Sequence, residues 1–271
     1  MNYEQYKNQL NEMYDEIYNN VSCGNRCPHW GKCKPDEPVK FYFDRVKVGA
    51  EYGTAYPKIL FSGLEGKYGE VSDYRIPEIF KPSLDANNSH YIGVRYVLSY
   101  LLSGISNETQ PINAEISELS ADIFVEHLKY YCLSNIYKCA FGSPGISRGL
   151  THTNTMKTEC YKIFFKEIDV LRPDIVVIQA VSEVPPNLWK EMLYKYGTGH
   201  QLLKGDGQKN NTSAYLLHYE DGAPFYCIWT YHGSGRPHGK GKAFGNNNIA
   251  YIQNELNPVL DKVIEVFKNK N

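Results

Sequence analysis

The chain has almost no net charge and no long apolar run. Its 29 Lys and Arg residues nearly balance its 30 Asp and Glu residues, which leaves a formal net charge of −1. This balance excludes a global basic field of the kind that attracts nucleic acid, although a local basic patch would not show in the sum. The sequence also lacks a signal-peptide-like N-terminal segment and any stretch of ~18 apolar residues. We therefore expect a soluble, cytoplasmic protein without membrane contact.

Repeats and compositional breaks are also absent from the sequence. The 271 residues are 42% hydrophobic and 22% charged, as in ordinary globular proteins, and a chain of this length can bury a sizeable core. We expect a single domain over residues 1–271. Its N-terminal helix and the following Cys-rich segment, about residues 1–38 together, are expected to be fastened onto the body.

Apolar patterning predicts short strands that alternate with helices. Strands are expected at 58–63, 131–137, 174–179 and 225–231, and helices at 3–18, 91–105, 118–129, 155–171, 186–196 and 249–268. The polar stretch 203–214 is expected to be a surface loop. This alternation predicts an α/β fold, specifically a three-layer α/β/α sandwich with a central, mostly parallel four-stranded sheet.

The ends of the four expected strands carry polar or glycine residues. In parallel sheets, ligands bind at the carboxyl ends of the strands. In chain order these ends carry Gly63–Gly66, Asn135, Gln179 and His232. We expect them to converge on one site.

The seven cysteines contain no CxxC…CxxC pair, so a zinc ribbon is not supported. Cys132 and Cys227 fall inside apolar strands and are expected to be buried thiols. Five others occupy polar, irregular or helical positions, namely Cys23, Cys27, Cys33, Cys139 and Cys160. In a reducing compartment such cysteines favour metal binding over disulfides. Thiolates suit both zinc and iron–sulfur clusters, and the spacing leaves both open.

Two segments resemble a known family. The sequences SNIYKC (134–139) and ECYKIFFKEIDVLRPDIVVI (159–178) are similar to the iron–sulfur class of the uracil-DNA glycosylase superfamily. The resemblance extends over roughly residues 20–265. It implies the α/β/α fold, DNA as the partner and a monomeric enzyme.

The resemblance also implies a [4Fe–4S] cluster with four cysteine ligands. Cys139 and Cys160 stand at two of the family's ligand positions, and the other two ligands come from the N-terminal segment. The family has a C-x2-C pair there, to which the spacing of Cys23 and Cys27 is closest, with Cys33 as a competing ligand. Zinc is the alternative metal. The expected task of the cluster is structural, because it would tie an irregular segment to the body.

Catalytic roles follow from the same resemblance. Gly63-Leu64-Glu65-Gly66 stands at the family's Gly-rich motif, which implies that Glu65 orients the attacking water and stabilises the cationic sugar. Glu70 and Asp73 are alternatives. His232 corresponds to the histidine that stabilises charge on the leaving base.

Base recognition is expected from Asn135, Gly63 and Gly66. An amide reads a base edge because it offers a donor and an acceptor side by side. The family's stacking Phe motif is missing, and Tyr74 or Phe80 is expected to replace it, with Tyr68 as a third candidate. Such a site requires that the base be flipped out of the stack.

In the sequence after His232, basic residues alternate with glycines. We expect this loop to contact the DNA backbone through Ser234, Arg236, Lys240 and Lys242. The resulting prediction is a DNA glycosylase that hydrolyses the N-glycosidic bond of a pyrimidine, uracil by default. The alternatives are a glycosylase for a modified pyrimidine in phage defence, a non-catalytic iron–sulfur module that binds nucleic acid, and a metal-containing redox regulator.

Overall fold

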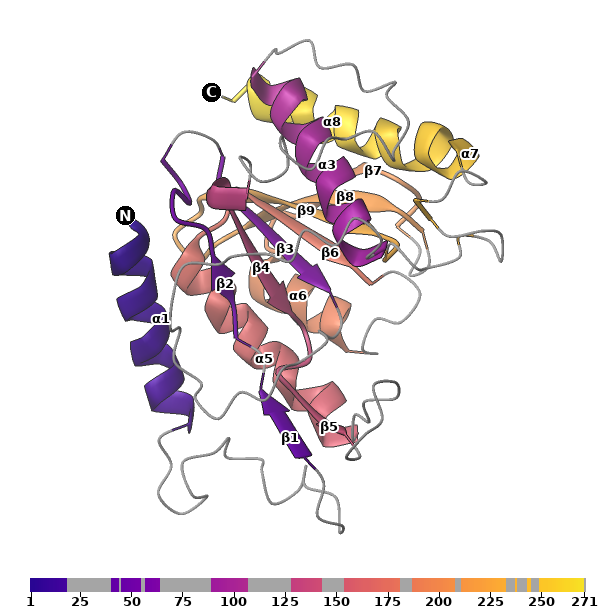
Figure 1. Cartoon of the computed structure of the whole chain (residues 1–271). Helices are drawn as coiled ribbons and strands as arrows, with labels where there is room; N and C mark the ends of the chain where they lie inside the picture. The colour runs from indigo at the N-terminus through magenta and orange to yellow at the C-terminus, as the bar shows by residue number, and fades with distance from the viewer. Residues whose placement is uncertain are drawn as a thin grey trace.

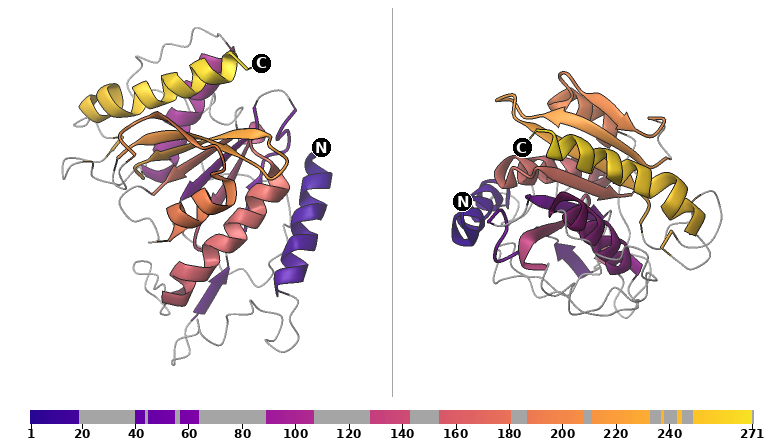
Figure 2. Two further views of the ribbon diagram at one scale, coloured as in Figure 1. Left: turned by 180° about the vertical axis from the view of Figure 1, so that it is seen from behind. Right: turned by 90° about the horizontal axis from the view of Figure 1, so that it is seen from above.

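The computed structural model describes residues 1–18, 40–43, 45–54, 57–63, 89–106, 128–142, 154–180, 187–207, 211–232, 237, 243–244 and 249–270. These ranges form a mixed sheet of seven strands with helices on both faces (Figures 1 and 2). A separate two-stranded sheet lies beside it. The predicted α/β class is confirmed.

Four parallel strands form the centre of the large sheet. In spatial order they are β4 (Tyr131–Asn135), β3 (Ile59–Gly63), β6 (Ile175–Gln179) and β9 (Pro224–Thr230). Every residue of β3, β4 and β6 is buried. Burial on both faces explains why these strands appear in the sequence as continuous apolar runs. All four were predicted, with bounds within two residues.

Antiparallel strands widen this centre to seven strands. The additional strands are β2 (Lys47–Val48) next to β4, β8 (Ser213–His218) next to β9, and β7 (Gln201–Lys204) next to β8. The predicted four-stranded sheet is therefore too narrow. The predicted surface loop 203–214 contains the end of β7 and the start of β8. β7 escaped prediction because it is an edge strand with mostly exposed side chains, which leaves no apolar pattern.

On one face of the sheet, α3 (Ser89–Ser106) packs beside the C-terminal helix (Figure 1). The C-terminal helix consists of α7 (Ile249–Tyr251), a π-helical segment (Ile252–Leu256) and α8 (Asn257–Lys268). One residue, Asn257, separates the π-helical segment from Pro258, whose ring nitrogen has no hydrogen to donate. The Tyr96 hydroxyl donates to Asn257 Oδ1 over 2.7 Å and joins α3 to α8.

The other face carries α1 (Tyr3–Tyr18), α5 (Asn154–Leu171) and α6 (Leu188–Tyr196) (Figure 2). The predicted helix 118–129 lies outside the described residues except for its last two positions, which belong to a 3-10 turn at Leu128–Tyr130. No helix in the described ranges has the length and apolar character needed to cross a membrane.

The small sheet pairs β1 (Lys40–Phe43) with β5 (Cys139–Gly142) in antiparallel register. Phe43 lies opposite Cys139. Neither strand was predicted, since Cys139 was expected to begin a loop. The pairing attaches the chain that follows the Cys-rich segment to the chain that follows β4.

A buried ion pair lies under the end of β4. Lys138 and Glu167 have fully buried side chains, and Lys138 Nζ lies 2.7 Å from Glu167 Oε2. Ser134 Oγ donates to the same oxygen over 2.6 Å, and the Tyr14 hydroxyl donates to Oε1. The Tyr14 oxygen in turn accepts the Val46 N–H at 2.9 Å. Burial raises the pKa of the Glu167 carboxyl, against the lowering effects of Lys138, Ser134 and Tyr14. One polar cluster thus connects α1, the entry to β2, the end of β4 and α5.

We expect Lys138→Met to lower the free energy of unfolding by about 3–5 kcal/mol, because Glu167 would be left as an uncompensated buried charge. Denaturant titration measures the change. Lys138→Met combined with Glu167→Met should recover most of the loss. Lys262→Met removes one partner of a solvent-exposed i,i+3 pair with Glu265 and should cost under about 1 kcal/mol. Equal effects of the Lys138 and Lys262 changes would contradict a structural role for the buried pair.

Candidate functional site

A row of four residues crosses the carboxyl edge of the parallel strands. Gly63 is the register partner of Asn135, and Gln179 is the partner of Thr230. Ser62 pairs with Ile178, so the next residues, Gly63 and Gln179, stand level. The row therefore runs Asn135, Gly63, Gln179, Thr230. Since residues level on neighbouring strands project to the same face of a sheet, these side chains share one face.

That face is the one covered by α3 and the C-terminal helix. Thr230 Oγ1 lies 2.8 Å from the hydroxyl oxygen of Tyr251 in α7. Gln179 Nε2 lies 2.8 Å from the point where a Cβ on Gly93 of α3 would stand. Ser134, one residue before the row, points to the opposite face and binds Glu167 of α5. The row and the buried ion pair thus lie on opposite sides of the sheet.

The structure brings together three of the residues expected to converge, Asn135, Gly63 and Gln179, and places a fourth on the same edge. Asn135 and Gly63 are neighbours, and Asn135 is 5% exposed. The Ile136 N–H donates to the Gly63 carbonyl over 2.9 Å, which holds the two strand ends together. His232 is half-buried and follows β9 at the far end of the row. Asn135 and Thr230 are three strand spacings apart, about 14 Å.

The remaining predicted site residues lie outside the described part of the chain. They are Glu65, Gly66, Tyr74 and Phe80 in the first loop, and Ser234, Arg236, Lys240 and Lys242 in the loop after His232. Their assignments stay predictions.

Gln179 was expected at this edge from its place at a strand end, but it was assigned no catalytic or base-binding role. Its side chain is fully buried, and neither its amide nitrogen nor its oxygen has a hydrogen-bond partner among the described residues. Leaving a buried polar atom unsatisfied costs about 1–3 kcal/mol. The signal in the sequence was a single long amide that ends the otherwise apolar strand IVVIQ.

Only part of the predicted cluster site is described. Cys23, Cys27 and Cys33 lie outside the described residues, and for Cys139 the structure gives the backbone in β5. Cys160 is buried in α5 with 3% exposure. Within the described ranges no three His, Cys, Asp or Glu side chains form a metal-binding group, but four of the five candidate thiols, all except that of Cys160, are not among the described side chains.

Two of the predicted cluster ligands, Cys139 and Cys160, lie in described elements. The β1–β5 pairing sets Cys139 opposite Phe43, on the chain that leaves the Cys-rich segment. The Cys160 thiol is withdrawn from bulk water in a neighbouring helix. A site with thiolate donors suits iron–sulfur clusters and zinc alike.

Cys132 and Cys227 are fully buried within their strands, as predicted. Burial raises the pKa of both thiols. A raised pKa keeps a thiol protonated and unreactive, so these two cysteines serve as core side chains.

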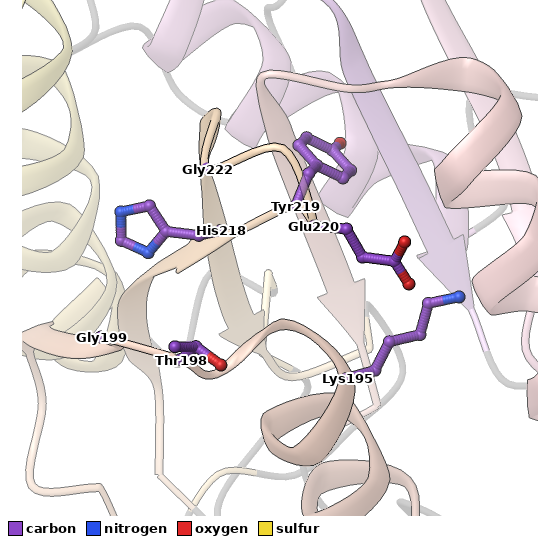
Figure 3. Close-up of a pocket in the computed structure, with 7 residues that line it drawn as sticks. All are labelled: Lys195, Thr198, Gly199, His218, Tyr219, Glu220 and Gly222. Carbon is purple, nitrogen blue, oxygen red and sulfur yellow. The ribbon is translucent and has the colours of Figure 1, made fainter.

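A surface pocket lies at the opposite edge of the sheet, around the turn between β8 and β9 (Figure 3). Its lining residues include Lys195, His218 and Glu220. Figure 3 shows the His218 ring directed away from Lys195 and Glu220. Lys195 is already engaged by Asp169. The polar groups of this pocket do not converge, so the row at the carboxyl edge is the better candidate site.

Gly93→Ala should disturb the row, because the added methyl group would stand 2.8 Å from Gln179 Nε2 and 2.9 Å from Phe244 Cε2. We expect a loss of about 1–3 kcal/mol in the free energy of unfolding, as for other overpacked cores. A double-mutant cycle with Gln179→Ala should give a coupling energy above about 0.5 kcal/mol. Strictly additive losses would show that Gln179 does not lie against Gly93.

No protein-family model matches the chain. No curated protein matches it at the level of similarity required for a relationship.

Proposed function

We propose that the protein is a DNA glycosylase that hydrolyses the N-glycosidic bond of a flipped pyrimidine and leaves an abasic site. The observation that carries this proposal is the shared carboxyl edge, where Asn135 and Gly63 are neighbours and His232 follows the last strand of the row. The accompanying fold is a three-layer α/β/α sandwich centred on the four parallel strands. Ligands bind at this edge in parallel α/β sheets.

Asn135 is the base-reading residue in this proposal. It ends a fully buried strand, so its position is fixed by the sheet and its carboxamide offers a donor and an acceptor to the Watson–Crick edge. Gly63 lies beside it and has no side chain, and we propose that the ring of the base sits over this strand end. Gly66, with Tyr74 or Phe80, would complete the base pocket.

Glu65 and His232 are proposed to act on the bond itself. Water adds its hydroxyl to the anomeric carbon, the C–N bond breaks, and the bonding pair leaves with the base, which takes up the proton. Glu65, two residues beyond Gly63, would orient the water and stabilise the positive charge on the sugar. His232 would donate a hydrogen bond to the base as negative charge develops on it.

Ser234, Arg236, Lys240 and Lys242 are proposed to hold the DNA backbone. Contacts of this kind position the duplex without reading its sequence. A local basic loop is compatible with the formal net charge of −1. The protein would act as a cytoplasmic monomer, in DNA repair with uracil as the substrate or in antiviral defence with a modified pyrimidine.

A [4Fe–4S] cluster is proposed on Cys139, Cys160 and two of Cys23, Cys27 and Cys33, with Cys23 and Cys27 favoured. Zinc is the alternative. When bound, the cluster supplies a covalent link between the N-terminal segment, the chain after β4 and α5. The β1–β5 pairing supports this arrangement.

Incubation with DNA that carries uracil or a modified pyrimidine, followed by alkali, tests the activity through strand cleavage at abasic sites. Glu65→Gln, Asn135→Ala and His232→Ala should each lower the single-turnover rate by about 100-fold or more, the scale for lost transition-state stabilisation. Asn254→Ala, an exposed amide in the C-terminal helix, serves as the matched control and should retain the wild-type rate. If no substrate is cleaved, the glycosylase proposal is contradicted, and the non-catalytic DNA-binding module remains as the alternative. Wild-type rates in all three variants would place the site elsewhere.

Purified protein should contain about four iron atoms and four sulfides per chain and absorb broadly near 400 nm, as expected for a [4Fe–4S] cluster. Cys139→Ser and Cys160→Ser should lose iron. Cys227→Ser, a change at a buried core thiol, should retain it. Stoichiometric zinc without visible absorbance would overturn the iron–sulfur assignment.

A further inference from the structure

Gln179 is placed to act together with Asn135. The two residues belong to one row and project to one face, two strands apart, about 10 Å. The strand between them contributes Gly63, so no side chain of that strand separates the two amides. A planar base seated over Gly63 would present one edge to each amide.

The described residues around Gln179 offer its amide no hydrogen bond. Gly93 of α3 and Phe244 pack against one another beside Gln179 Nε2, and both amide atoms lack a partner among the described residues. The preceding residues of β6 are apolar and fully buried. An apolar residue at this position would continue the strand without the cost of an unsatisfied amide. Buried polar groups left without partners mark positions that need another explanation, such as a ligand.

We propose that Gln179 is a specificity-determining residue that hydrogen-bonds to a polar substituent at C5 of the target pyrimidine. This inference rests on the proposed glycosylase function. With the Watson–Crick edge of the ring at Asn135, the C5–C6 edge faces Gln179. That edge carries only C–H groups in uracil and cytosine. A hydroxyl-bearing substituent at C5 would supply the hydrogen-bonding partner that the amide lacks among the described residues. Because Gln179 is fully buried, contact with the substituent requires the side chains that cover the amide to rearrange when the base binds.

The test compares single-turnover cleavage of DNA carrying uracil with DNA carrying 5-hydroxymethyluracil. Wild-type protein should prefer the hydroxymethyl base, and Gln179→Met should lower that preference by about tenfold, the equivalent of one hydrogen bond of about 1.4 kcal/mol. The thermal midpoint should stay level or rise, because the change removes unsatisfied polar atoms from the core.

Tyr226→Phe is the matched control. It also removes a buried polar atom that has no partner among the described residues, but near the start of β9, at the opposite edge of the sheet. It should leave the substrate preference unchanged.

An unchanged preference in Gln179→Met, with wild-type cleavage intact, would overturn the role of Gln179 and leave the glycosylase proposal standing. A lower thermal midpoint together with an unchanged substrate preference would mean that the Gln179 amide hydrogen-bonds to a structural water and not to the base. Absence of cleavage in the wild-type protein on every DNA tested would overturn both proposals.

Discussion

The register of the four parallel strands is the constraint on which the candidate site depends. It sets Asn135, Gly63, Gln179 and Thr230 level at one edge, although they come from four separate segments of the chain. A slip of one residue in the pairing of any two of these strands would turn the row residue of the slipped strand to the opposite face of the sheet. Burial of β3, β4 and β6 on both faces opposes such a slip. The packing of these buried strands therefore also aligns the row of residues at their carboxyl ends.

The buried Lys138–Glu167 pair secures the strand that carries Asn135 from the other side of the sheet. Ser134 binds Glu167, while its neighbour Asn135 belongs to the row. Lys138 directly precedes β5, which pairs with β1. A few consecutive residues therefore connect the candidate base site, the helix layer and the attachment of the N-terminal segment. This arrangement would allow one short stretch to serve both the proposed base-binding edge and the proposed cluster.

Much of this architecture could be predicted from the sequence, because doubly buried strands appear as apolar runs and amphipathic helices have a clear period. The exposed edge strand β7 has no such pattern. β1 and β5 form a ladder between distant segments, which local sequence does not encode. The contact of Lys138 with Glu167 joins residues far apart in the chain. Gln179 could be placed at a strand end, but only the three-dimensional structure shows that its amide has no partner among the described residues.

The most direct test of the carboxyl edge as the base-binding site is the response of its side-chain amides to DNA. Nitrogen-15 spectra would be recorded for the Asn135 and Gln179 carboxamides, with and without DNA that carries a non-cleavable pyrimidine nucleotide bearing a C5 hydroxymethyl group. Asn135→Ala and Gln179→Met assign the two signals. The account predicts that both amide signals shift on binding. Binding that leaves both signals unmoved would contradict it.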